Sequence, residues 1–277
     1  TVNTLVGIAG IVLLIFLLFS GMPVGFLMAL LGFAGFSCVI SIKAGLGIVI
    51  MDIFGVFSSY NLTVIPLFIL MGQVAFHAGI GRRLYDAAYI LSKHLPGGLA
   101  IATIGACASF AAICGSTNAS AATMTTVALP EMKRYRYDMK LATGTIAAGS
   151  SLGIMIPPSV IFIIYGIMTQ QSIGKLFVAG IVPGILIALL FIVTIYVWVK
   201  LKPGVAPYKQ NNSGCAKLDV LIGVAESIFL FLLVMGGLFA GFFTPTEAGA
   251  IGAGGTILLS VLRKNLTWSK FIQAVLE

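Results

Sequence analysis

Residues Pro96 to Pro130 read PGGLAIATIGACASFAAICGSTNASAATMTTVALP, an apolar stretch with a cluster of small polar residues near its middle. Basic residues flank this stretch on both sides. Those before it are Arg82, Arg83 and Lys93, and those after it are Lys133, Arg134, Arg136 and Lys140. Because Lys and Arg accumulate on the cytoplasmic side of bilayer proteins, both flanks are expected on one side of a membrane. The pattern therefore predicts that the stretch enters a bilayer, turns, and leaves on the side from which it came.

The turn is expected at the small polar sequence that runs from Cys114 to Asn118. Non-helical backbone at membrane depth is tolerated only where protein buries it or where it lines a watery cavity. A re-entrant hairpin over residues 96–130 would therefore be a functional element, and it indicates transport. Two complete crossings joined by a tight turn would also leave both flanks on one side of the membrane. Each arm has only about 16 residues, fewer than the roughly 20 that a crossing needs, which favours the re-entrant hairpin.

The composition places the whole chain in a bilayer. Of its 277 residues, 59% are hydrophobic and 9% are charged, and the mean hydropathy is +1.11. A soluble domain carries about 25% charged residues, so the fold class expected is an all-α polytopic membrane protein. The net charge of +8 would also suit a nucleic-acid-binding protein. The basic residues lie at the ends of apolar runs, where orientation signals belong, so no nucleic-acid partner is expected.

The distribution of basic residues also predicts an orientation, if the hairpin is re-entrant and the other apolar runs cross. Of the 16 Lys and Arg residues, only Lys43 and Lys175 then fall on the outer side. A single crossing by residues 96–130 would remove this bias. The positive-inside rule therefore favours the hairpin and places the N-terminus outside.

Two segments between the apolar runs differ from the rest. In the segment from Gly81 to His94, apolar side chains share one helical face, which predicts an interfacial helix over residues 80–95. Residues 202–217 are rich in Pro, Gly, Asn, Gln and Lys. They are expected to form a cytoplasmic loop that joins two halves of the chain.

A second interrupted segment follows the hairpin. Residues 149–159 read GSSLGIMIPPS, in which two Gly and two Pro residues break an apolar run near its middle. Proline removes a backbone donor, and the carbonyl groups that it frees are costly to leave unpaired in lipid. Bare carbonyls and Ser hydroxyls could bind a cation instead, and two interrupted segments that meet at mid-membrane are typical of secondary transporters. A simple proline kink with close helix packing is the alternative.

Other motifs say less about function. The sequence from Gly149 to Gly153 matches the G-x-S-x-G pattern of hydrolases, but that pattern needs a strand before a helix, so no enzyme is expected. Thr244, Pro245 and Glu247 fit a capping box at a helix start. Glu226 lies in an apolar run, where a functional role and a contact at the interface or with a partner subunit both stay open. The three residues expected to be solvated loop carboxylates are Asp52, Asp86 and Asp138.

Several segments together resemble a known family. They occur in the family's order and spacing, and the likeness that they carry spans the whole chain. The segments are Gly115-Ser116, residues 130–133, Tyr137-Asp138, residues 149–158, 164–166, 172–177, Ala179-Gly180, Pro183-Gly184 and residues 243–248. On these residues the chain resembles the large membrane subunit of TRAP (tripartite ATP-independent periplasmic) transporters, of the DctM-like type. The resemblance implies Na⁺-coupled secondary transport of organic acids, such as C4-dicarboxylates or sialic acids, into a bacterial cell.

The resemblance also implies partners, a location and a fold. A periplasmic substrate-binding protein would deliver the organic acid, and a small membrane subunit would pack against this one in the inner membrane, with the N-terminus periplasmic. The fold implied is two inverted repeats, each with an interfacial arm helix, a re-entrant hairpin and a broken helix. The first repeat would cover residues 1–201, with the arm helix at 80–95, the hairpin at 96–130, the broken helix at 139–169 and a helix at 174–201. Residues 218–277 would begin the second repeat, which is expected to be incomplete here.

Carried over residue by residue, the resemblance implies one Na⁺ site between the hairpin tip and the broken helix. The residues implied are Gly115, Ser116 and Asn118 of the tip, with Ser150, Gly153 and Pro157 of the break, several of them through main-chain carbonyls. Thr117 and Ser151 are the candidates for substrate contacts. Cys114, Asn118 and Thr125 depart from the family's commoner residues. The alternatives left open are a dicarboxylate/Na⁺ symporter that needs no binding protein, and a non-transporting membrane scaffold fragment.

Overall fold

The structure is a computed structural model that describes residues 2–207 and 217–276, without the side chains of residues 2–3 and 217–222. Throughout these residues the regular structure is helical, which confirms the all-α class. The contacts divide the chain into two units, residues 1–59 and residues 60–277, which are described separately. Most of the predicted loop over residues 202–217 lies outside the described residues.

The first unit contains three helices that contact one another in chain order, namely α1 (Val2–Leu18), α2 (Val24–Val39) and α3 (Ile42–Phe57). Helix α3 begins at Ser41, whose side chain accepts a hydrogen bond from the Ala44 amide at 3.2 Å. The sequence analysis predicted that Asp52 lies in a loop. That placement is wrong, because Asp52 lies inside α3, whose apolar residues continue to Phe57. Large apolar side chains on all three helices are exposed within this unit.

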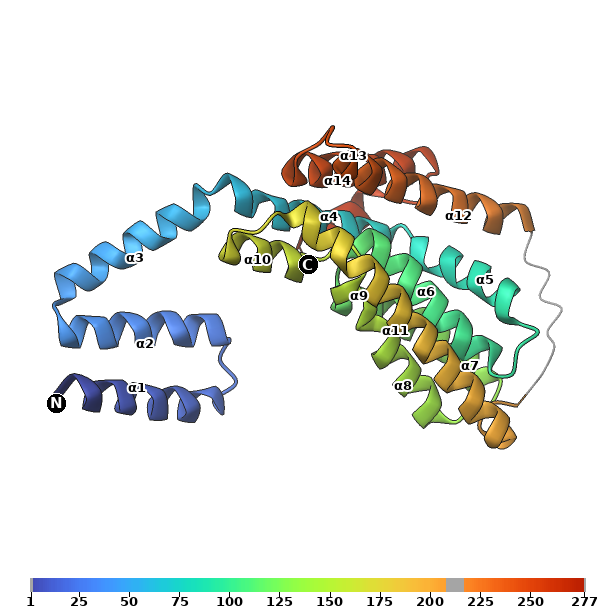
Figure 1. Cartoon of the computed structure of the whole chain (residues 1–277), viewed down its shortest axis with the longest axis horizontal. Helices are drawn as coiled ribbons and strands as arrows, with labels where there is room; N and C mark the ends of the chain where they lie inside the picture. The colour runs from blue at the N-terminus through green and yellow to red at the C-terminus, as the bar shows by residue number, and fades with distance from the viewer. Residues whose placement is uncertain (1, 208–216, 277) are drawn as a thin grey trace. The chain divides into compact units, whose positions relative to one another are not determined.

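The second unit has a helical framework around two interrupted segments (Figure 1). The elements of the framework are η1 (Tyr60–Thr63), α4 (Val64–His77), α5 (Ile80–Ser92), α11 (Ile173–Leu201), η2 (Pro203–Val205), α12 (Lys217–Phe231), the π-helical turn η3 (Leu232–Gly236), α13 (Gly237–Phe239), α14 (Pro245–Leu262) and α15 (Trp268–Leu276). Helices α4 and α14 pack closely because Gly249 and Gly252 of α14 face Phe68 and Met71 of α4. The capping box predicted at Thr244 is confirmed, with both of its reciprocal hydrogen bonds present.

The first interrupted segment is a helical hairpin. Helix α6 (Gly98–Cys114) and helix α7 (Thr117–Arg134) contact each other and are joined by Gly115 and Ser116 alone (Figure 1). The helix does not end at Pro130, where the sequence boundary was set, but continues to Arg134. Proline blocks the turn that precedes it rather than the turn that follows, so residues 131–134 remain helical.

The second interrupted segment consists of three short helices, α8 (Met139–Ser150), α9 (Leu152–Met155) and α10 (Val160–Thr169). Helix α8 begins at Asp138, an exposed residue whose carboxylate accepts a hydrogen bond from the Lys140 amide at 2.7 Å. The loop predicted at Asp86 is wrong, because Asp86 lies inside α5 and is half-buried. Helix α10 begins at Ser159, whose hydroxyl accepts a bond from the Phe162 amide at 3.5 Å. The backbone between α9 and α10 is non-helical over residues 156–159.

Three helical stretches among the described residues are long and apolar enough to cross a membrane: Tyr60–His77, Met139–Thr169 and Ile173–Leu201. Helix α6 is apolar but has only 17 residues. At about 1.5 Å per residue that is roughly 26 Å of helix, less than a bilayer core of about 30 Å.

Candidate functional site

The tip of the hairpin is a two-residue turn that ends one helix and begins the next. Gly115 has a φ of 57°, and its amide donates a hydrogen bond to the Ala111 carbonyl at 3.0 Å. This left-handed backbone terminates α6 at little cost because glycine has no β-carbon. Ser116 then caps α7, since its hydroxyl accepts a hydrogen bond from the Ala119 amide at 3.3 Å. The first amides of α7 are therefore presented at the tip.

The hairpin tip lies directly against the break. A β-carbon added to Gly153 would be 3.0 Å from the Ser116 carbonyl carbon and 3.1 Å from the Thr117 amide nitrogen. A β-carbon added to Gly115 would overlap the Pro158 carbonyl oxygen. The two glycines thus let the tip contact the break at Gly153 and at Pro158.

The break leaves carbonyl groups without helical donors. In an α-helix the Gly153 carbonyl would bond the amide of residue 157, and the Ile154 carbonyl that of residue 158. Both positions are proline, which has no N–H. The last backbone bond of this turn runs from the Ile156 amide to the Leu152 carbonyl at 2.9 Å, and no amide of the described chain bonds the Gly153 or Ile154 oxygen. These oxygens therefore keep their lone pairs available.

The remaining candidate residues differ in their surroundings. Ser150 is 1% exposed and donates its hydroxyl proton to the Ile146 carbonyl at 2.7 Å. Ser151 is half-buried and donates to the Ala148 carbonyl at 2.7 Å, while Thr117 is half-buried at the first position of α7. Asn118 is exposed. Both Ser oxygens keep lone pairs for a ligand.

The structure therefore brings together Gly115, Ser116 and Thr117 of the tip with Gly153 and the Pro157-Pro158 turn of the break. Ser150 lies one turn before Gly153 and is buried. No side-chain hydrogen bond in the described residues joins Asn118 or Ser151 to the other segment. Oxygen atoms of carbonyls and hydroxyls suit a hard cation, so the donor set fits Na⁺.

The sequence reasoning missed the residues that hold the two segments together. A β-carbon on Gly72 of α4 would lie 2.9 Å from the Cys114 carbonyl oxygen, and one on Gly184 of α11 would lie 2.9 Å from the Ile156 side chain. Gly72 and Gly184 thus let α4 and α11 pack on the tip and the break. The available signal was small residues inside apolar spans, which indicate close helix approach.

A comparison with protein families decides what this arrangement belongs to. Residues 11–277 match the family model described as "Tripartite ATP-independent periplasmic transporter, DctM component". The chain belongs to this family. The resemblance inferred from the sequence is therefore confirmed.

Curated members of the DctM family resemble this chain at moderate identity. The C4-dicarboxylate TRAP transporter large permease protein DctM of Pseudomonas aeruginosa is 38% identical over 196 residues, which cover 70% of this chain and 45% of that protein. The protein of that name from Rhodobacter capsulatus is 31% identical, over 92% of this chain and 60% of the relative. The sialic acid TRAP transporter large permease protein SiaM of Vibrio cholerae is 31% identical, over 94% and 60%. The chain thus spans about half the length of these DctM relatives.

The chain also contains a group of three ion-paired residues around Glu226, whose role the sequence analysis left open. One carboxylate oxygen of Glu226 on α12 lies 3.4 Å from Nη2 of Arg83 on α5, and the other pairs with Nε of Arg263 at the end of α14. The Glu226 side chain is only 11% exposed. Glu226 therefore binds partners within this chain and links three helices that are distant in sequence.

Proposed function

We propose that this chain is the membrane-embedded large subunit, or a part of it, of a Na⁺-coupled transporter that imports organic acids. Membership of the DctM family supports the proposal, as do the relatives named for C4-dicarboxylate, sialic acid and 2,3-diketo-L-gulonate. A periplasmic binding protein and a small membrane subunit would be its partners. The location would be a bacterial inner membrane. The protein would act as a transporter and not as an enzyme.

The observation that carries this proposal is the contact between the hairpin tip and the break. The ligands proposed for Na⁺ are Gly115, Ser116, Asn118, Ser150, Gly153 and Pro157, partly through main-chain carbonyls. Support comes from the donor-free carbonyl groups at the break and from Ser116, whose backbone lies against Gly153. A bound Na⁺ would supply positive charge and hold the two segments together.

The organic acid would bind beside the cation. The first amides of α7 carry the partial positive charge of a helix N-terminus, which attracts a carboxylate. Thr117 stands at this terminus and Ser151 joins α8 to α9, so these hydroxyls are the proposed substrate contacts. Binding of Na⁺ and of the acid would then favour one another, since a cation and a carboxylate bound side by side attract each other.

We place the hairpin in the membrane as a re-entrant element. The α6 arm is too short for an untilted crossing. The basic residues Lys93 and Arg134 lie at the two ends of the whole hairpin. This topology puts the N-terminus in the periplasm. Single cysteines at positions 93 and 134 should both react with a membrane-impermeant reagent from the cytoplasmic side only, and labelling from opposite sides would contradict the re-entrant path.

The transporter would work by alternating access, with the hairpin and broken helix moving against the framework. The first inverted repeat is proposed to cover residues 1–201 and the second to begin at residue 218. Uptake by the full-length protein with its partner subunits, reconstituted in vesicles, tests the function. An inward Na⁺ gradient should drive accumulation of a labelled organic acid, whereas a K⁺ gradient should not. Equal uptake under both gradients would contradict coupling to Na⁺.

A further inference from the structure

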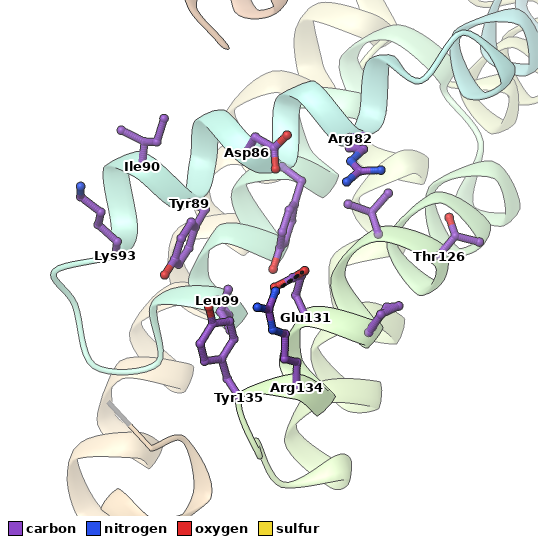
Figure 2. Close-up of a pocket in the computed structure, with 13 residues that line it drawn as sticks. Arg82, Asp86, Tyr89, Ile90, Lys93, Leu99, Thr126, Glu131, Arg134 and Tyr135 are labelled. Atoms are coloured by element: carbon purple, nitrogen blue, oxygen red, sulfur yellow. Dashed lines mark ion pairs between the residues drawn. The ribbon is translucent and has the colours of Figure 1, made fainter. Parts of the chain in front are cut away.

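A cavity of 610 Å³ lies between α5 and the second half of α7, away from the contact of tip and break. Figure 2 shows Arg82, Asp86 and Lys93 on the α5 side and Glu131 with Arg134 on the α7 side. None of the proposed Na⁺ ligands lines this cavity. It therefore needs an account of its own.

The charged groups around the cavity favour an anion. Three cations and two carboxylates line it, which leaves one net positive charge. Glu131 pairs with Arg134 at 3.9 Å, and the charge of Arg82 acts on Asp86. Lys93 is half-buried at the end of α5, and no carboxylate of the described residues lies within ion-pairing distance of it. Lys93 is thus the cation least compensated by the protein itself.

Tyr85 provides the second, independent observation. It lines the cavity and is 3% exposed, and its hydroxyl is buried without a hydrogen-bond partner in the described residues. Burial and the nearby Glu131 carboxylate raise the pKa of this phenol, so it stays a proton donor. A buried hydroxyl without a partner is costly, and an acceptor inside the cavity would remove that cost.

Apolar residues extend the site beyond its charged part. Ile90, Leu99 and Val127 also line the cavity. A site that combines cations, a buried phenol and apolar walls suits a ligand with an anionic head and an apolar body. A soluble anion would leave those apolar walls unused.

We propose that this cavity binds the phosphate of an anionic phospholipid headgroup, held by Lys93 and the Tyr85 hydroxyl, while Arg82 adds positive charge from the start of α5. Lys and Arg bind phosphate oxygens through charge-assisted hydrogen bonds. The lipid would come from the cytoplasmic leaflet, whose surface is negative. The inference rests on the interfacial position proposed for α5 but not on Na⁺ coupling or transport. An occupied cavity would fix the arm helix to the cytoplasmic end of the hairpin.

Native mass spectrometry of the full-length protein, stripped of lipid and titrated with phosphatidylglycerol or phosphatidylcholine, tests the proposal. Phosphatidylglycerol should bind more tightly. Lys93→Gln should weaken this binding about tenfold, and Tyr85→Phe, which keeps the ring and its packing, about threefold. Lys133→Gln is the matched control, because Lys133 is exposed, carries the same charge and does not line the cavity.

Three results would overturn the lipid site. One is equal affinity for the two lipids. Another is an equal loss of binding in Lys93→Gln and Lys133→Gln, which would mean that only surface charge matters. The third is binding of glycerol 3-phosphate as tight as that of the lipid, which would assign the cavity to a soluble phosphate. Since the readout is binding, a protein that fails to transport could still pass this test.

Discussion

The backbone of Gly153 lies against the backbone of Ser116. A β-carbon added to Gly153 would be only 3.0 Å from the Ser116 carbonyl carbon. One residue lies in a broken helix and the other at the tip of a hairpin. Two backbones approach this closely only where a glycine leaves room. The contact places donor-free carbonyl groups beside a helix start, which is the arrangement that a small cation and a carboxylate would share.

The first prediction concerns Gly115, the turn residue of the tip. Gly115→Ala places a β-carbon against the Pro158 carbonyl oxygen in addition to straining a left-handed backbone. Gly79→Ala is the matched control, because Gly79 has a φ of 73° but open space around it. The control should lose about 1–2 kcal/mol and Gly115→Ala clearly more. Thermal unfolding in detergent measures both, and an equal loss would mean that the tip does not press on the break.

The second prediction separates side-chain ligands from carbonyl ligands. Ser116→Ala, Ser150→Ala and Asn118→Ala each remove one side-chain oxygen near the proposed cation. A true side-chain ligand should raise the Na⁺ concentration for half-maximal uptake about tenfold when removed. Ser150→Ala should have the largest effect because Ser150 is buried, and exposed Asn118 the smallest. Unchanged Na⁺ dependence in all three would contradict the side-chain assignment and leave carbonyl ligation alone.

The third prediction concerns the carboxylate shared by two arginines. Glu226→Gln leaves Arg83 and Arg263 side by side and only partly solvated. The protein should lose about 1–3 kcal/mol, because burial makes an unpaired charge costly. Glu131→Gln is the control. Its ion-pair partner Arg134 is 71% exposed, and the pair is separated by 3.9 Å. The control should change stability by at most about 0.5 kcal/mol. Equal unfolding temperatures for the two variants would contradict a stabilising role for Glu226.

The fourth prediction is a pH dependence at the start of α14. Hydrogen bonds from the Thr244 amide and hydroxyl lower the pKa of Glu247 below its ordinary value of 4.5. A lowered pKa in the folded state adds stability that is fully present above pH 4.5 and is lost as the pH falls through the lowered pKa. Thr244→Ala loses the hydroxyl bond to the Glu247 carboxylate together with the N-cap, so it should destabilise the protein more at neutral pH than in acid, where only the loss of the cap remains. Unfolding temperatures measured from about pH 3 to pH 7 test this.

A matched control exists for that pH dependence. Ser41 caps α3 through its hydroxyl without any carboxylate. Ser41→Ala should cost about 1 kcal/mol by loss of a cap, with no difference between acid and neutral pH. If Thr244→Ala showed the same flat profile, the capping carboxylate would have no part in stability.

The sequence was informative where the chemistry is local. Pro157 and Pro158 remove helix donors in any context, and Gly115 suits a left-handed turn, so the break and the tip were predictable. Ser41 is also a local helix-start signal, and it marks the start of α3, the helix that contains Asp52. The partners of Glu226 were not predictable, because Arg83 and Arg263 are far from it in sequence and only packing brings them together. The cavity around Tyr85 likewise depends on how α5 lies on α7.

Binding of Na⁺ by the full-length protein tests the contact of tip and break most directly. Na⁺, compared with K⁺ at equal ionic strength, should raise the unfolding temperature. At a Na⁺ concentration of a hundred times Kd, the folded state should gain about 2.7 kcal/mol of stability. Gly153→Ala should abolish this Na⁺ effect, because a β-carbon there meets the Ser116 backbone. Gly144→Ala, which adds a β-carbon in open space on the same segment, should retain it. Equal stabilisation of both variants, or equal effects of Na⁺ and K⁺, would contradict a sodium site between hairpin and broken helix.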